Sequence, residues 1–130
     1  MASSTEQNKA VVSRFMTEVL QGGKLDLVDE LLAPNYVNPG MGNADRDTFK
    51  GILTAFLSVA PHFHLEELVA EGDSVVARFG LEITQAEGKI TARGMAYYKL
   101  ADGKIVEDDP ITSPELTQLL APQMAQMAHA

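Results

Sequence analysis

The chain has 130 residues, of which 45% are hydrophobic and 22% charged, a balance typical of one folded domain. Its formal charge of −8 disfavours nucleic acid and anionic membranes as partners, because both bind basic surfaces. The absence of cysteine excludes disulfides, thiolate nucleophiles and cysteine-ligated metals, and no apolar run approaches the ~20 residues of a membrane span. The polar N-terminus has no signal-peptide core, so we expect a cytoplasmic location.

Apolar periodicity predicts helices in the first half of the chain. From Val12 to Leu20, apolar residues recur every three or four positions, as on one face of a helix, and Gly22 and Gly23 end the pattern. Two further helical patterns follow and end near prolines. The predicted helices cover about residues 3–20, 25–32 and 45–60, the last capped by Asp45 or Asp47, and the loop at 35–43 includes a small strand around residues 36–38.

After Pro61, polar and apolar residues alternate, which predicts strands. The strands are expected at residues 62–70, 74–85, 89–100 and 104–108. Short turns join them, among them Asp102-Gly103, a strong hairpin signal, so the four strands form an antiparallel meander. A short helix is predicted at residues 114–120, with Ser113 as its cap.

Helices followed by such a sheet indicate an α+β fold in which the helices cover one face of a curved antiparallel sheet. Three helices do not fill the concave face completely, which leaves a pocket for a small-molecule ligand. No linker or internal repeat divides the chain. We therefore expect one domain over residues 1–130, with a core at about 7–120 and a tail at 121–130.

Several segments resemble those of a known family. They are LDLVDELL at residues 25–32, YVNP at 36–39, VAEGDSVVAR at 69–78 and DGKIVE at 102–107. Over about residues 7–120 the chain resembles the SnoaL-like polyketide cyclases of the nuclear transport factor 2-like superfamily. The resemblance implies a cone-shaped α+β barrel, often dimeric, in which an acidic residue near the end of the last strand acts as acid and base in an intramolecular aldol closure. It also implies that no metal or organic cofactor takes part.

The end of the last strand departs from the family pattern. The family commonly reads Glu-His-Trp-Asp there, and the corresponding residues of this chain are Glu107, Asp108, Asp109 and Pro110. Proline thus occupies the position of the catalytic aspartate, while the positions of two family histidines hold Ala96 and Asn38.

Asp108 is the predicted catalytic residue. The resemblance implies that position 110 faces the pocket, and because neighbouring residues of a strand point to opposite faces, this selects Asp108 over Asp109. An apolar pocket raises the pKa of a carboxyl, which makes it an acid and base useful near neutral pH. A solvated strand end is the alternative interpretation.

Six further residues are candidates for ligand binding. Tyr36 and Asn38 lie where the loop crosses the pocket mouth, and Tyr98 is favoured over Tyr97 as the pocket-facing tyrosine. His62 and His64 share one face of the first strand, opposite Phe63, Leu65 and Val69; with no third ligand nearby, we expect no metal there and consider a general base or a solvated face instead. Arg78 either orients an anionic ligand or forms a surface ion pair.

Three functions remain open from the sequence. The first is a cofactor-free cyclase, isomerase or hydrolase that acts on a small, mostly apolar carbonyl compound; hydrolysis of an epoxide would need Asp108, Arg78 and Glu82 to converge. The second is a non-catalytic small-molecule binding domain, and the third is an interaction module. We also expect a homodimer through the outer face of the sheet, where tyrosine, methionine and branched side chains remain.

Overall fold

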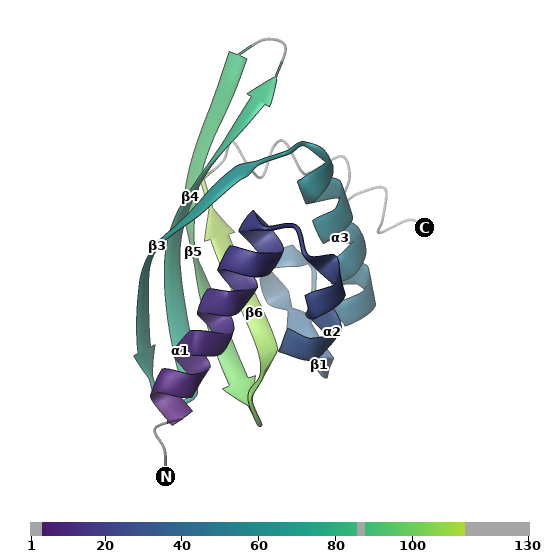
Figure 1. Cartoon of the computed structure of the whole chain (residues 1–130). Coiled ribbons are helices and arrows are strands. Elements are labelled where there is room, and N and C mark those ends of the chain that lie inside the picture. Colours follow the sequence, from purple (N-terminus) through teal and green to yellow (C-terminus); the bar gives the residue numbers. More distant parts are fainter. Residues whose placement is uncertain (1–3, 86–87, 114–130) are drawn as a thin grey trace.

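A computed structural model describes residues 4–85 and 88–113, which form a layer of helices on one curved sheet (Figure 1). The sheet has six strands in the order β2-β1-β6-β5-β4-β3. The helical elements are α1 (Ser4–Arg14), η1 (Phe15–Gln21), η2 (Leu25–Leu27), α2 (Val28–Leu31), η3 (Pro39–Met41) and α3 (Arg46–Ser58). The strands are β1 (Leu32–Asn38), β2 (Ala44–Asp45), β3 (His62–Glu71), β4 (Ser74–Gln85), β5 (Gly88–Ala101) and β6 (Lys104–Thr112).

The predicted first helix exists, but its second half is a π-helix. α1 continues directly into the π-helical segment η1, which buries Phe15, Met16 and Val19. Gly23 then takes a left-handed conformation (φ 73°) that glycine adopts without strain, and the chain turns toward α2. The third predicted helix is α3, and the Asp45 side chain caps it by accepting a hydrogen bond from the backbone N–H of Thr48 at 2.8 Å.

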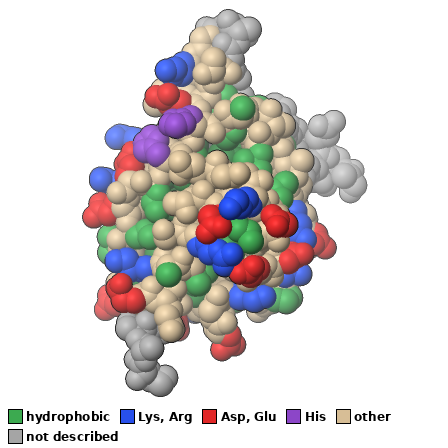
Figure 2. All heavy atoms as spheres, in the orientation of Figure 1, with side chains coloured by type: hydrophobic (Ala, Val, Ile, Leu, Met, Phe, Trp, Pro, Cys, Tyr) green, Lys and Arg blue, Asp and Glu red, His purple; other side chains and the backbone are tan. Residues whose placement is uncertain are grey.

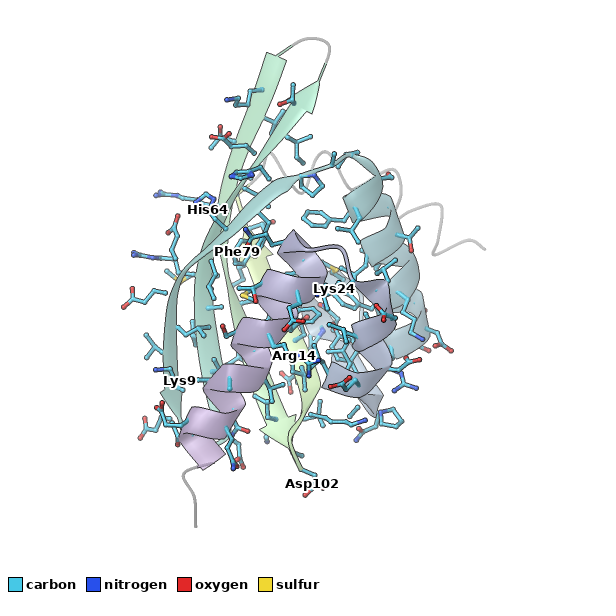
Figure 3. The ribbon with its side chains drawn as sticks, in the orientation of Figure 1. Lys9, Arg14, Lys24, His64, Phe79 and Asp102 are labelled. Atoms are coloured by element: carbon cyan, nitrogen blue, oxygen red, sulfur yellow. The ribbon has the colours of Figure 1, made fainter. Side chains whose placement is uncertain are left out.

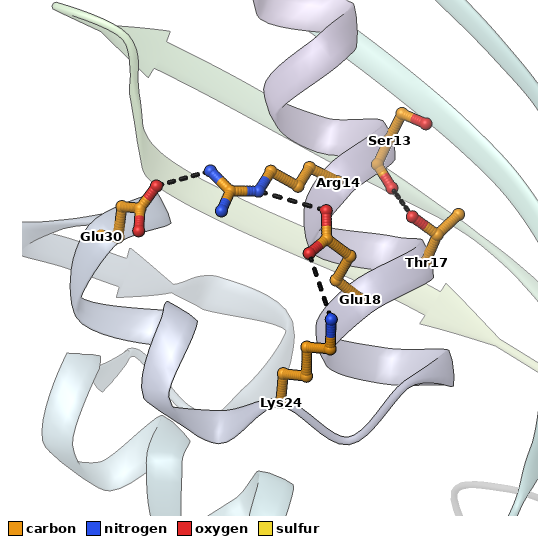
Figure 4. A network of polar contacts seen from close by, with 6 residues as sticks. All are labelled: Ser13, Arg14, Thr17, Glu18, Lys24 and Glu30. Carbon is orange, nitrogen blue, oxygen red and sulfur yellow. Dashed lines mark hydrogen bonds and ion pairs between the residues drawn. The ribbon is translucent and has the colours of Figure 1, made fainter.

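Exposed ion pairs connect the helices on the solvent side (Figure 4). Arg14 contacts both Glu18, one turn further along the helix, and Glu30 of α2, while Lys24 lies 3.8 Å from Glu18. Such exposed pairs contribute little stability each, so the buried apolar side chains hold the helix layer on the sheet. Arg14 and Lys24 lie on this layer in Figure 3, and Asp102 marks the turn between β5 and β6.

The four-stranded antiparallel meander is confirmed as β3 to β6, and its outer strand carries a bulge. The predicted inner face of β4 is buried, namely Val75, Ala77, Phe79, Leu81 and Ile83. In β3, the pairing with β4 shifts between Leu65 and Glu67. This bulge inverts the alternation, so Val69, expected on the same face as Phe63, is exposed instead.

The sheet is mixed rather than purely antiparallel, because the chain before the meander adds two strands. The helix expected over residues 25–32 is shorter: Leu32 already has extended backbone, and β1 runs from there to Asn38. β1 pairs parallel with β6, and the short β2 pairs antiparallel with β1. The small strand expected around residues 36–38 is thus the end of β1, and it lies beside the strand that carries Asp108.

The core lies between the helix layer and the concave face of the sheet. Aromatic rings form its centre: Phe15 contacts Phe49 and Tyr98, with ring centroids 6.2 and 6.1 Å apart, and Phe63 stacks on Phe79 at 5.1 Å. None of the described helices is long and apolar enough to cross a membrane. The helix predicted at 114–120 and the tail at 121–130 lie outside the described residues.

Candidate active site

A small cavity opens between the helix layer and the concave face of the sheet. Its volume is about 70 Å³, and most of its walls are apolar or aromatic. Asp108 is the one carboxyl among the described residues that line it, and no lysine, arginine or histidine joins it. The full lining consists of Phe15, Met16, Leu20, Met41, Phe49, Ile52, Leu53, Phe56, Phe79, Leu81, Ala96, Tyr98, Asp108, Pro110 and Thr112.

Asp108 enters the cavity because of the alternation of β6. Its cross-strand partner on β5 is Tyr98, and both side chains are buried, Asp108 with only 3% of its surface exposed. The neighbouring Asp109 pairs with Tyr97 and belongs to the opposite face. The structure therefore places Asp108 and Tyr98, the two residues that the sequence favoured over their neighbours, at the same cavity wall.

A chain of hydrogen bonds links Asp108 to β1. The Tyr36 hydroxyl donates to Asp108 Oδ2 at 2.8 Å, and Asn38 Nδ2 donates to the Tyr36 hydroxyl at 2.9 Å. Tyr36 and Asn38 are two residues apart on β1, so both point to the same face of the sheet. Parallel pairing of β1 with β6 brings this face beside Asp108, which lies 72 positions away in sequence.

Asn38 is the most enclosed polar residue of this chain of hydrogen bonds. Its surface is 0% exposed, and its Oδ1 has no hydrogen-bond partner among the described residues. Leaving a buried acceptor unpaired costs about 1–3 kcal/mol, so structural needs alone do not explain an asparagine at this position.

The environment of Asp108 changes its proton affinity. Burial raises the pKa of the Asp108 carboxyl to about 7, because the charged form loses its hydration. The hydrogen bond from Tyr36 opposes this rise by stabilising the carboxylate, and the charge of Asp109 adds to it. Burial also raises the pKa values of Tyr36 and Tyr98, and the nearby Asp108 charge acts in the same direction, so both hydroxyls keep their protons near neutral pH.

Of the six predicted ligand-binding residues, only Tyr98 is among the described residues that line the cavity. Tyr36 and Asn38, expected at the pocket mouth, are buried on β1 behind Asp108, and the other three lie on the outer face of the sheet.

His62 and His64 are exposed on β3, with their rings 6.3 Å apart, and Figure 2 shows the histidine side chains together on the surface. Arg78 is exposed on β4 and contacts Glu66 and Glu67. Figure 3 shows the contrast between the exposed His64 and Phe79, whose buried side chain lines the cavity.

The cause is the alternation of the strands. His62, His64 and Arg78 occupy positions that alternate with the buried Phe63 and Phe79, so they face away from the helices. Their expected placement in the pocket is corrected, and Glu82, which shares their face, does not converge with Asp108 either. Among the described residues, no group of three or more histidine, aspartate or glutamate side chains is arranged to hold a metal ion.

Proline at position 110 is accommodated by the segment η3. Pro110 pairs with Ala96 of β5, yet its backbone N and O lie against Gly40, where an added Cβ would approach them to 3.0 and 2.6 Å. The missing N–H of proline therefore points toward η3 and not toward β5, so the strand continues to Thr112. The sequence predicted that β6 would end at Asp108, and it missed Thr112 and Met41 as cavity residues.

The model of the SnoaL-like domain matches residues 12–108, so the chain belongs to the SnoaL-like family. No curated protein matches the sequence.

Solved structures with the same fold include two described as "putative polyketide cyclase". That from Acidithiobacillus ferrooxidans is 22% identical, with a TM-score of 0.73, and the match covers 94% of this chain and 99% of that one. That from Bacillus cereus is 24% identical, with a TM-score of 0.77 and coverage of 88% and 80%. AclR from Streptomyces galilaeus, described as "a putative hydroxylase", is 17% identical, with a TM-score of 0.73, and the match covers 90% of this chain and 86% of that one. At these identities the structures establish the fold alone, in which helices cover a curved sheet.

Proposed function

We propose that the protein is a SnoaL-like enzyme that transforms a small, mostly apolar carbonyl compound by cofactor-free acid and base catalysis. The reaction is a cyclisation, isomerisation or hydrolysis, and Asp108 is the catalytic residue. Tyr98 borders the same cavity and would contact the ligand, whereas Tyr36 and Asn38 reach it through Asp108.

The observation that carries this proposal is that Asp108 is the one carboxyl among the described residues that line the apolar cavity. A carboxyl with a pKa of about 7 is present in both protonation states near neutral pH, which is the condition for efficient proton transfer in both directions. The carboxylate form accepts a proton from the carbon next to a carbonyl group, and the acid form returns a proton to the resulting enolate or to a carbonyl oxygen. The apolar walls keep water away from such an enolate.

A non-catalytic binding domain is the alternative, and the size of the cavity favours it. Sites for drug-sized ligands usually measure about 300–1,000 Å³, so a ligand larger than a few atoms requires the helix layer to move away from the sheet. A binding domain needs no carboxyl with a raised pKa, however, and burying one costs stability.

The variant Asp108→Asn distinguishes the two functions, because it keeps the shape of the side chain and removes its proton transfer. On a small cyclic or open-chain ketone that the wild type converts, we expect turnover to fall by about 10²-fold or more while the dissociation constant changes little. Deuterium exchange next to the ketone carbonyl, followed by NMR, measures the same step without a full reaction. Exchange at the wild-type rate in Asp108→Asn would leave the binding domain as the better account.

We also propose that the protein forms a homodimer through the outer face of the sheet. Val69, Val76, Met95 and Ile111 are exposed there, and cross-strand pairing places Val69 beside Val76 and Met95 beside Ile111. This set of four residues is called the outer patch below. Exposed large apolar side chains that gather on one face commonly mark an interface between proteins.

A further inference from the structure

The order of donors and acceptors in the chain Asn38–Tyr36–Asp108 has a consequence for the proton of Asp108. The Nδ2 group of asparagine can only donate, so the Tyr36 hydroxyl accepts at that contact. A hydroxyl has one proton, and the remaining contact, 2.8 Å from Asp108 Oδ2, uses it. Oδ2 is therefore already an acceptor of a hydrogen bond before any ligand arrives.

The other oxygen of the Asp108 carboxyl, Oδ1, is not engaged by Tyr36. Asp108 lines the cavity and Tyr36 does not. Because Tyr36 engages Oδ2, we infer that Oδ1 is the oxygen that a ligand in the cavity would contact. Asp108 receives no second side-chain hydrogen bond from the described residues that would occupy Oδ1. The two oxygens of one carboxyl thus have different surroundings.

We propose that Tyr36 and Asn38 are positioning residues that assign the transferable proton of Asp108 to Oδ1. Tyr36 keeps Oδ2 as an acceptor, and Asn38 keeps the Tyr36 hydroxyl directed at Oδ2 by occupying its lone pair. This inference rests on the proposed function only in that the reacting ligand occupies the cavity; the position of the proton is a property of the free protein.

The opposite direction of the chain fails for the ionised state. If the Asn38 amide were turned, Tyr36 would donate to Asn38 Oδ1, and its lone pairs would face the carboxylate Oδ2 at 2.8 Å. That arrangement requires a proton on Oδ2, so it is compatible only with the protonated form of Asp108. The observed direction is compatible with both the carboxylate and the carboxylic acid form of Asp108. A residue that acts as base and then as acid passes through both forms, so it requires such an arrangement. In the observed direction the buried Oδ1 of Asn38 has no hydrogen-bond partner among the described residues.

Among the described residues, the polar and charged groups that act on Asp108 come from three strands. Tyr36 lies on β1, Tyr98 on β5 and Asp109 on β6 itself, while the helix layer contributes apolar residues such as Phe15 and Phe49 to the cavity. Tyr98 is a matched control, because its hydroxyl is also buried beside Asp108 but makes no hydrogen bond to it.

The first measurement is the titration of Asp108 in the intact protein, by NMR of its side-chain carboxyl carbon and without any ligand. The hydrogen bond from Tyr36 stabilises the carboxylate of Asp108 and so lowers its pKa. Its loss in Tyr36→Phe should raise the pKa of Asp108 by about one to two pH units. Asn38→Leu, or Asn38→Ala if the leucine variant does not fold, should raise it less, because Tyr36 remains but is no longer held. Tyr98→Phe should change it little. A purely structural role for Tyr36 would lower stability and leave the titration unchanged.

The second measurement locates the proton by infrared spectroscopy of the acid form at about pH 5, below the pKa of about 7. The carbonyl band of Asp108 is identified by its absence in Asp108→Asn. With the proton on Oδ1, the carbonyl oxygen is Oδ2, which accepts from Tyr36, so Tyr36→Phe should shift the band to higher frequency. With the proton on Oδ2, the carbonyl oxygen is Oδ1, and the band should not rise.

Two results would overturn the inference: an unchanged pKa of Asp108 in Tyr36→Phe, or a carbonyl band that does not rise. Neither measurement depends on turnover. If Asp108→Asn leaves proton exchange on ketones intact but both spectroscopic results are as expected, the proposed function fails while the assignment of the proton stands. If turnover falls in Asp108→Asn but the spectra disagree, the proposed function stands and the role of Tyr36 and Asn38 fails.

Discussion

The burial of Asp108 makes the stability of the protein depend on pH. Its pKa is about 7 in the folded protein and close to 3.8 in the unfolded chain. Because the folded pKa is the higher one, the unfolded chain releases its proton first as the pH rises. The resulting loss of stability begins near pH 4, is complete above pH 7, and amounts to roughly 4 kcal/mol at most.

The variant Asp108→Asn removes this dependence. It should unfold at higher urea concentration than the wild type at pH 8, by about 1–3 kcal/mol after allowance for an amide that faces an apolar cavity. The gap between the two proteins should narrow as the pH falls from 7 to 4, because the wild type then folds with a neutral carboxyl. Urea unfolding at several pH values measures the gap. A gap that does not change with pH would mean that Asp108 titrates near its ordinary value in the folded protein.

Strand alternation contributed to the choice of single residues, but it did not decide that choice alone. Asp108 was selected because the resembled family has position 110 facing its pocket and alternation then points residue 108 the same way, and Tyr98 was favoured over Tyr97; both line the cavity. The same alternation already placed His62 and His64 opposite Phe63, so their chemistry, and not the pattern, led to the expectation of ligand contacts. The hydrogen bond between Tyr36 and Asp108 could not be predicted, since it depends on the parallel pairing of β1 with β6 and no local pattern specifies that pairing.

At the scale of elements, the site depends on how closely η3 approaches β6. Gly40 lies against the backbone of Pro110, and η3 carries Met41, which lines the cavity. A glycine there permits backbone to contact backbone, and a proline opposite it avoids an unpaired N–H. Gly40 and Pro110 thus form a close backbone contact. The sequence alone could not predict this contact, because it depends on the pairing of β1 with β6.

The variant Gly40→Ala should therefore destabilise the protein, because its Cβ would lie 2.6–3.0 Å from Pro110 backbone atoms that have little freedom to move. The expected loss is about 1–3 kcal/mol, measured by urea unfolding. Asn43→Gly is the control in the same loop: Asn43 is exposed and has φ of 61°, a conformation that glycine adopts readily, so stability should change by no more than about 0.5 kcal/mol. Equal stability of Gly40→Ala and the wild type would show that η3 does not lie this close to β6.

At the scale of the whole molecule, the two faces of the sheet differ in what covers them. The concave face holds the core and the cavity, and the helices cover it (Figure 1). The outer face carries the outer patch, bordered by charged residues such as Glu66, Arg78 and Arg93. A groove of about 500 Å³ runs between these charges and Met95 and Ile111. An apolar centre with a charged rim is the usual anatomy of a protein interface.

A second copy of the chain is the partner that we expect on this face. An isologous contact requires that one patch complement itself, and the border contains both acidic and basic residues that can pair across a two-fold axis. Sedimentation equilibrium at tens of micromolar protein should give twice the chain mass of 14.0 kDa. Ile111, which is 76% exposed, is the residue to change, because a substitution there hardly affects the folded monomer.

Ile111→Lys should shift the mass toward that of one chain, since each copy would bring a lysine into the apolar centre beside the arginines of the other. Ala10→Lys introduces the same side chain at an exposed position of α1, on the helix layer, and should remain dimeric. Circular dichroism checks that both variants keep the fold. A wild-type mass of 14.0 kDa would exclude the dimer at that concentration. A dimer that persists in Ile111→Lys but dissociates in Ala10→Lys would move the interface to the helix layer.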